Sequence, residues 1–111
     1  MQIMSEALGD GRAVLRVEGR LNLVTAPELR AAVQQAVEED TARVVVDLAG
    51  VTFIDSSGLG MVIAGLKHAR QAGGELRIAA AGEQVRMVLE LTKLHRILRP
   101  YESVDGALEG L

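Results

Sequence analysis

The segment from Val51 to Gly60, VTFIDSSGLG, connects a strand-like run to a helix-like run through one acid, two serines and a glycine. Apolar residues at helical spacing, beginning with Leu59, follow this junction. A helix start leaves backbone N–H groups unpaired and favours an anion. The two serines could therefore cap the helix, act as a nucleophile or carry a phosphate. We expect Ser57 to be the cap, as Ser often is at such positions, which leaves the hydroxyl of Ser56 free.

Strand and helix patterns alternate along the rest of the chain in the order β-β-α-β-α-β-α-β-α. The predicted strands cover residues 2–7, 13–19, 43–48, 76–80 and 97–101. Two predicted helices follow Thr25 and the Asp55–Ser57 junction, a third is marked by Val85, Val88, Leu89 and Thr92, and Ser103 caps a terminal one. With 111 residues, the chain suits one domain and is too short for two separate cores. We therefore predict a single α/β domain over residues 1–111, with a mixed, mostly parallel five-stranded sheet flanked by helices. Whether the first two strands pair directly stays open.

Composition disfavours several classes of function. A net charge of −3 and only one Tyr and one Phe disfavour nucleic-acid binding. The absence of cysteine excludes disulfides, thiolate catalysis and Cys-based metal sites. The N-terminal residues lack the features of a signal peptide, and no apolar run is long enough to span a membrane. We expect a soluble cytoplasmic protein without a membrane association.

Enzymatic readings of the serine junction also find little support. The phosphate-binding glycine motifs of nucleotide-binding enzymes are absent. A serine hydrolase needs a histidine near its nucleophile, but His68 lies about three turns further along the helix and His95 precedes the last predicted strand. A phosphoaspartate receiver would need a carboxylate pair after its first strand to hold Mg²⁺, and only single acids occur there. We therefore expect no catalysis, no cofactor and no metal.

The site is instead predicted to be acted upon by other proteins. The segments Gly19–Asn22 and Asp55–Ser57 both follow strands, so they should meet at one edge of the sheet. Thr25 and Glu28 have the spacing of a capping box for the helix that follows the first of these segments. Past the serines, one helix face carries small or flexible residues that either bind a partner or pack under a loop: Gly60, Met61, Ala64, Gly65 and His68.

These residues resemble a STAS domain, the fold of bacterial anti-sigma factor antagonists. The resemblance spans essentially the whole chain, and its most specific part is the Asp-Ser-Ser-Gly-Leu-Gly core at residues 55–60. It implies a partner switch in transcription regulation: the unphosphorylated protein binds an anti-sigma factor that is also a serine/threonine kinase, and so frees a sigma factor. Phosphorylation on Ser56, with Ser57 as second choice, ends that binding, and a serine phosphatase resets the switch. The implied partner-binding residues are Asn22, Thr25, Asp55, Ser56, Ser57, Gly58, Leu59, Gly60, Met61 and Ala64.

Three positions depart from the family pattern. Asn22 stands where the family usually has Asp, Lys93 where it favours Gly, and His95 where it often has an acid. STAS domains also serve in stress-sensing scaffolds and as small subunits of lipid-exporting ABC transporters, and these roles remain the alternative. The intact Asp55-Ser56-Ser57 motif, without a fused sensor or membrane region, favours a free-standing antagonist.

Overall fold

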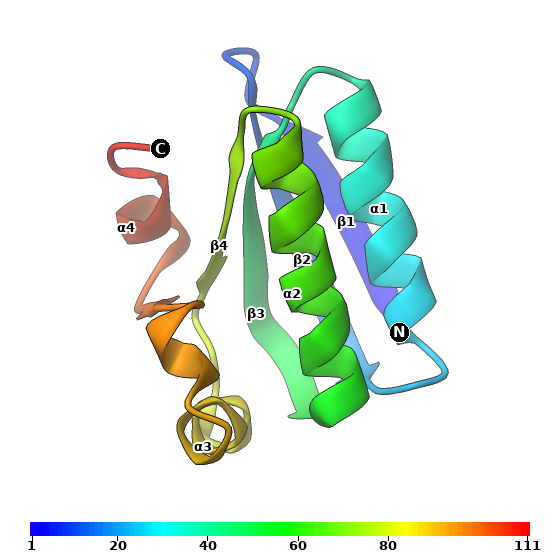
Figure 1. Ribbon diagram of the computed structural model, residues 1–111, viewed down its shortest axis with the longest axis vertical. Coiled ribbons are helices and arrows are strands. Elements are labelled where there is room, and N and C mark those ends of the chain that lie inside the picture. The colour runs from blue at the N-terminus through cyan, green and yellow to red at the C-terminus, as the bar shows by residue number, and fades with distance from the viewer.

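The structure, a computed structural model, describes residues 1–111 as one sheet with helices on both faces (Figure 1). Five strands lie in the order β1-β2-β3-β4-β5. The strands are β1 Gln2–Ala7, β2 Arg12–Leu21, β3 Arg43–Ile54, β4 Glu75–Ala79 and β5 Pro100–Tyr101. The helices are α1 Ala26–Glu38, α2 Ser56–Gln71, α3 Glu83–Leu91 and α4 Val104–Leu108, with a 3₁₀ turn at Leu94–Arg96.

The sheet is mixed and mostly parallel, as predicted. β1 pairs antiparallel with β2, which answers the question that the sequence left open. The pairs β2–β3, β3–β4 and β4–β5 are all parallel. β3 is the central strand and runs well past its predicted end, because it includes both the Arg43–Leu48 run and the Val51–Ile54 run.

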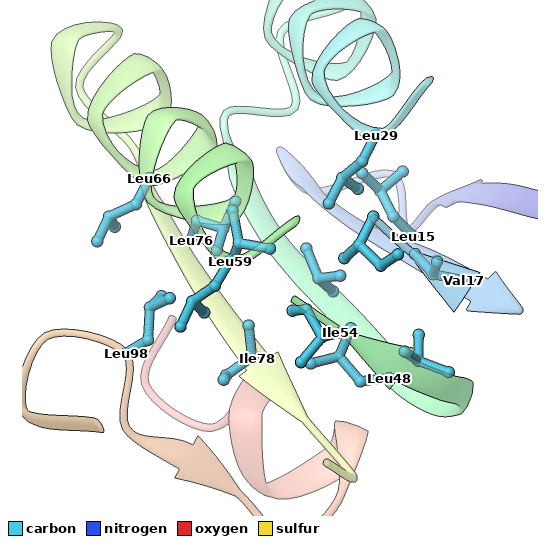
Figure 2. Close-up of a cluster of buried hydrophobic side chains, with 14 of the residues drawn as sticks. Leu15, Val17, Leu29, Leu48, Ile54, Leu59, Leu66, Leu76, Ile78 and Leu98 are labelled. Carbon is cyan, nitrogen blue, oxygen red and sulfur yellow. The ribbon is translucent and has the colours of Figure 1, made fainter. Parts of the chain in front are cut away.

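The main core lies between the sheet and the adjacent helices α1 and α2 (Figures 1 and 2). Leu15 and Val17 from β2 face Leu29 of α1, and Ile54 of β3 lies near Leu59 of α2 (Figure 2). A second, smaller cluster on the opposite face joins the sheet to α4, and its members are Val14, Val45, Ala79 and Ala107. This second cluster explains why β2 and β3 are apolar on both faces at these positions.

The C-terminal end of the sheet differs from the sequence prediction. A strand was expected over residues 97–101, but β5 contains only Pro100 and Tyr101. Before it, the N–H groups of Ile97 and Leu98 both donate to the carbonyl of Leu94, which closes a turn in place of a strand ladder. Leu98 is buried in the main core while Ile97 is exposed, so the turn satisfies the same hydrophobic pattern.

Two residues at helix ends had been singled out in the sequence, Ser103 as a cap and Lys93 as a departure from the family pattern. Ser103 caps α4, as expected, and its Oγ accepts the N–H of Gly106 at 3.0 Å. Lys93, which stands where the family favours Gly, has a left-handed backbone with φ of 60°. None of the helices combines the length and the apolar character that crossing a lipid bilayer requires.

Candidate functional site

The two loops singled out in the sequence meet at the carboxyl edge of the sheet, as predicted. The last pair of the β2–β3 ladder joins Leu21 to Ile54, and the N–H of Asp55 donates to the carbonyl of Leu21 at 3.3 Å. The β2–α1 loop and the N-terminus of α2 therefore lie side by side at one end of the molecule (Figure 1). We call the segments Leu21–Thr25 and Asp55–Gly60 together the switch edge.

Asp55, and not Ser57, caps α2, so the predicted cap was wrong. The backbone of Asp55 is extended, with φ of −109° and ψ of −178°, and its Oδ1 accepts the N–H of Gly58 at 2.8 Å. The helix already begins at Ser56, which places Ser57 inside the first turn, where its hydroxyl cannot reach forward to an N–H in the way a cap does. A carboxylate also suits the partial positive charge of the helix start.

Both serine hydroxyls are consequently free of a structural task. Neither side chain takes part in any of the hydrogen bonds around the cap, where Asp55 alone serves Gly58. Ser56 is exposed, whereas Ser57 is half-buried. Ser56 is therefore distinguished from Ser57 by its greater exposure, and not because Ser57 is occupied as a cap.

Two of the predicted partner-binding residues lie under the surface. Leu59 is only 2% exposed and belongs to the main core (Figure 2). Gly58 is buried, and a Cβ built on it would lie 2.3 Å from the carbonyl oxygen of Leu21. These residues hold the first turn of α2 against β2, so they support the switch edge and do not offer side chains to a partner.

The small-residue face of α2 is partly covered. Gly60 and Ala64 are exposed, and a Cβ on Gly60 would meet nothing within 4 Å. Met61 is half-buried and packs against the main core. Gly65, in contrast, is buried, because Val33 and Leu76 occupy the space beside it. The surface that remains open to another protein is therefore the first two turns of α2.

The β2–α1 loop is held by side chains and not by the predicted capping box. Thr25 itself has a helical backbone conformation, and its Oγ1 donates to the carbonyl of Arg20 at 2.6 Å. The Oδ1 of Asn22 accepts the N–H groups of Val24 and Thr25, at 3.0 and 3.1 Å. Because these contacts use only the oxygen of Asn22, an Asp side chain could make the same turn, and Asn keeps the shape of the loop without the charge.

Sequence reasoning missed Leu23 and Val24, at the tip of this loop. Leu23 is 71% exposed and Val24 is 84% exposed, which makes Val24 the most exposed large apolar side chain of the chain. Two apolar residues inside a loop, outside any strand or helix periodicity, are the signal that could have identified them. They extend the switch edge with an apolar tip.

The remaining polar groups do not gather into a second centre. His68 lies half-buried along α2, and Nδ1 of His95 is 3.4 Å from the carbonyl oxygen of Leu89. No three His, Cys, Asp or Glu side chains are grouped so that they could hold a metal ion. The largest groove, of about 560 Å³, lies between β1 and α1 and includes no residue of the switch edge.

Known proteins share this small α/β domain with a serine at a strand-to-helix junction. A family model described as "STAS domain" matches residues 5–107. The chain is 31% identical to an anti-sigma-B factor antagonist of Staphylococcus epidermidis over 91 residues, which cover 82% of this chain and 84% of that protein. It is 28% identical to an anti-sigma F factor antagonist of Paenibacillus polymyxa over 102 residues, which cover 91% of this chain and 87% of that protein.

A solved structure agrees with these sequence relatives. The crystal structure of an anti-sigma factor antagonist from Mycobacterium paratuberculosis superposes with a TM-score of 0.84 at 30% identity, covering 97% of this chain and 91% of that one. The chain therefore belongs to the STAS domain family of bacterial anti-sigma factor antagonists.

Proposed function

We propose that this chain is a phosphorylation-controlled antagonist that binds an anti-sigma factor with serine kinase activity and thereby frees a sigma factor. The observation that carries the proposal is the hydroxyl of Ser56, which is exposed at the first residue of α2 and has no structural task. Phosphorylation of Ser56 by the bound kinase ends the interaction, and a serine phosphatase restores the binding form. The protein itself acts by binding and performs no catalysis.

The composition of the switch edge supports a protein partner. Exposed apolar groups on Leu23 and Val24 lie in the loop beside the open first turns of α2, where Gly60 and Ala64 allow close approach. Apolar side chains beside small residues offer area for burial without a large loss of side-chain entropy. We assign the partner contact to Asn22, Leu23, Val24, Ser56, Gly60 and Ala64.

The same surface explains how one phosphate could act as a switch. No Lys or Arg occurs in Leu21–Thr25 or Asp55–Gly60, and Asp55 precedes the acceptor directly. A phosphoserine adds about −1.5 to −2 charges at neutral pH. Pressed into an interface, this group loses its water, and the switch edge itself contains no cationic side chain to replace it. Binding therefore weakens through desolvation and local repulsion.

Phosphate mapping tests the proposed acceptor. The chain is incubated with ATP and the kinase-type anti-sigma factor, and the modified peptide is identified by mass spectrometry. We expect phosphate on Ser56 in the wild type and in Ser57→Ala, the matched control, and no incorporation in Ser56→Ala. Labelling of Ser56→Ala at the wild-type rate would contradict the assignment.

Affinity purification from the native cell tests the partner class separately. Recovery of a kinase-type anti-sigma factor agrees with the proposal. Recovery of a transporter ATPase or of a large stress-sensing assembly in its place would favour the alternative roles of STAS domains.

A further inference from the structure

The last part of β3 lacks a strand neighbour on one side. β4 pairs with β3 only from Arg43 to Asp47, whereas β3 continues to Ile54. On the other side, the β2 ladder continues as far as the pair Leu21–Ile54. The end of β3 that leads into Asp55 and Ser56 is therefore an edge on its β4 side, with backbone groups that need partners.

The side chain of Gln84, from α3, takes the place of the missing strand. Its Oε1 accepts the N–H of Ile54 at 2.9 Å, and its Nε2 donates to the carbonyl of Ile54 at 2.9 Å. A strand residue directs its N–H and C=O to the same side. The carboxamide therefore makes the same two hydrogen bonds that the opposite residue of a neighbouring antiparallel strand would make. Only this orientation of the amide satisfies both groups of Ile54.

This contact fixes the residue from which the switch edge starts. Ile54 is 1% exposed and immediately precedes Asp55, the cap of α2. On the β2 side, the N–H of Asp55 is held by the carbonyl of Leu21. The entry into α2 is thus held from β2 on one side and from α3 on the other, while Val85 and Leu89 anchor α3 in the main core.

We propose that Gln84 is the positioning residue for Ser56: its carboxamide holds the end of β3 so that the acceptor hydroxyl is presented in one place to kinase and partner. Without it, the N–H and C=O of Ile54 lose their partners inside the fold and the entry into α2 shifts or opens to reach water. The functional part rests on the proposed role of Ser56, whereas the positioning itself is measurable on the isolated chain.

Amide hydrogen exchange followed by NMR tests the positioning. Gln84→Met keeps the length of the side chain and removes both hydrogen bonds, and Gln35→Met is the matched control, because Gln35 is exposed on α1 and bonds only to the side chain of Glu39. We expect exchange at Ile54 and Asp55 to accelerate by about tenfold or more in Gln84→Met relative to the amides of Val44–Val46 in the same strand. Unchanged exchange at Ile54, or equal acceleration at Val44–Val46, would overturn the proposal.

Gln84→Glu adds a signature that a packing role would not give. A protonated carboxyl group can accept from the N–H of Ile54 and donate to its carbonyl, but an ionised carboxylate can only accept and repels that carbonyl. Because the neutral form is the one that is hydrogen-bonded twice, the introduced group should have a pKa above the usual value of about 4.3. We expect relative protection of Ile54 to be lost at pH 7 and recovered at low pH in this variant alone. Protection that is the same at both pH values would count against the carboxamide pairing.

Phosphoryl transfer to Ser56 tests the consequence. With both variants shown to be folded, we expect the initial rate for Gln84→Met to fall by about tenfold, with Gln35→Met at the wild-type rate. An unchanged rate for Gln84→Met would show that Gln84 does not affect phosphorylation of Ser56. If even the wild-type chain accepts no phosphate on Ser56, the proposed function fails, while the exchange result still decides whether Gln84 positions the segment.

Discussion

Asp55 performs the structural work at the start of α2 and leaves both serine hydroxyls available. Its carboxylate accepts the N–H of Gly58 at 2.8 Å and lies at the end of the helix where the backbone dipole favours negative charge. Ser57, two positions past the cap and inside the first turn, contributes only its half-buried side chain. The Asp of the Asp-Ser-Ser motif therefore has a structural role, as the N-cap of α2.

Substitution of the cap should separate Asp55 from Ser57. We expect Asp55→Ala to lower the free energy of unfolding by about 0.5–2 kcal/mol, and Asp55→Asn to lower it less because Asn also caps. Ser57→Ala should change it by no more than about 0.5 kcal/mol. Urea titrations of the three variants check this, and a loss in Ser57→Ala equal to that in Asp55→Ala would disprove the cap assignment.

Lys93 carries backbone strain at the end of α3. Its φ of 60° lies in the left-handed region, where a side chain costs about 1–2 kcal/mol and glycine costs little. After subtraction of the greater backbone freedom of glycine in the unfolded chain, Lys93→Gly should stabilise the fold by about 0.5–1 kcal/mol. Thermal unfolding provides the measurement, with Lys93→Ala as control, since it keeps the Cβ and should give no gain. Equal stabilisation by both substitutions would show that charge, and not backbone conformation, matters at this position.

Among the elements, the β2–α1 loop joins a rigid base to an exposed apolar tip. Asn22 and Thr25 hold the base through hydrogen bonds, while Leu23 and Val24 extend into solvent. Because these side chains bury little area in the isolated domain, they are available for the partner contact proposed above.

Charge placed on the loop tip should therefore affect binding and not folding. We expect Leu23→Asp combined with Val24→Asp to change the stability by no more than about 0.5 kcal/mol and to weaken partner binding by about tenfold or more. Met4→Thr, at another half-exposed apolar residue on β1, should leave the affinity unaltered. Calorimetric titration with the anti-sigma factor measures the affinity. Wild-type affinity of the double variant would show that the loop tip is not part of the interface.

The elements also show where sequence patterns carry enough information and where they do not. The order of strands and helices and the meeting of two loops at one edge follow from periodicity and from the rules of parallel sheets, and both were confirmed. The cap of α2 was misjudged because Asp and Ser are equally good caps, so only the helix start, two residues earlier than a Ser57 cap would place it, distinguishes them. β5 was overestimated because a turn buries Leu98 as well as a strand would.

Gln84 illustrates a contact that no local pattern reveals. In the sequence it is one polar residue in the first turn of a short helix, and its role depends on β4 ending at Ala79 while β3 continues to Ile54. That mismatch of strand lengths is a property of the assembled sheet. Side chains that complete a backbone ladder across such a gap become visible only when both elements are in place.

At the scale of the whole molecule, we expect one phosphate to leave the fold unchanged. The helix N-terminus returns about 0.3–1 kcal/mol for a negative charge, and repulsion from Asp55 opposes this gain. Both contributions are small against the burial of the main core. We expect amide NMR shifts on phosphorylation to be confined to the switch edge, to Ile54 before it and to Gln84 of α3. Large shifts throughout β1 and α1 would instead indicate a global rearrangement.

The affinity of the anti-sigma factor for the two forms of the chain tests the switch most directly. A dianion buried at an edge that contains no Lys or Arg should cost about 3–4 kcal/mol at the interface, which is a loss of roughly 100- to 1,000-fold in affinity. Titration calorimetry with the unphosphorylated and the Ser56-phosphorylated chain measures this ratio. Surface blocking predicts weakening of that size with the fold preserved, and equal affinity of the two forms would contradict it.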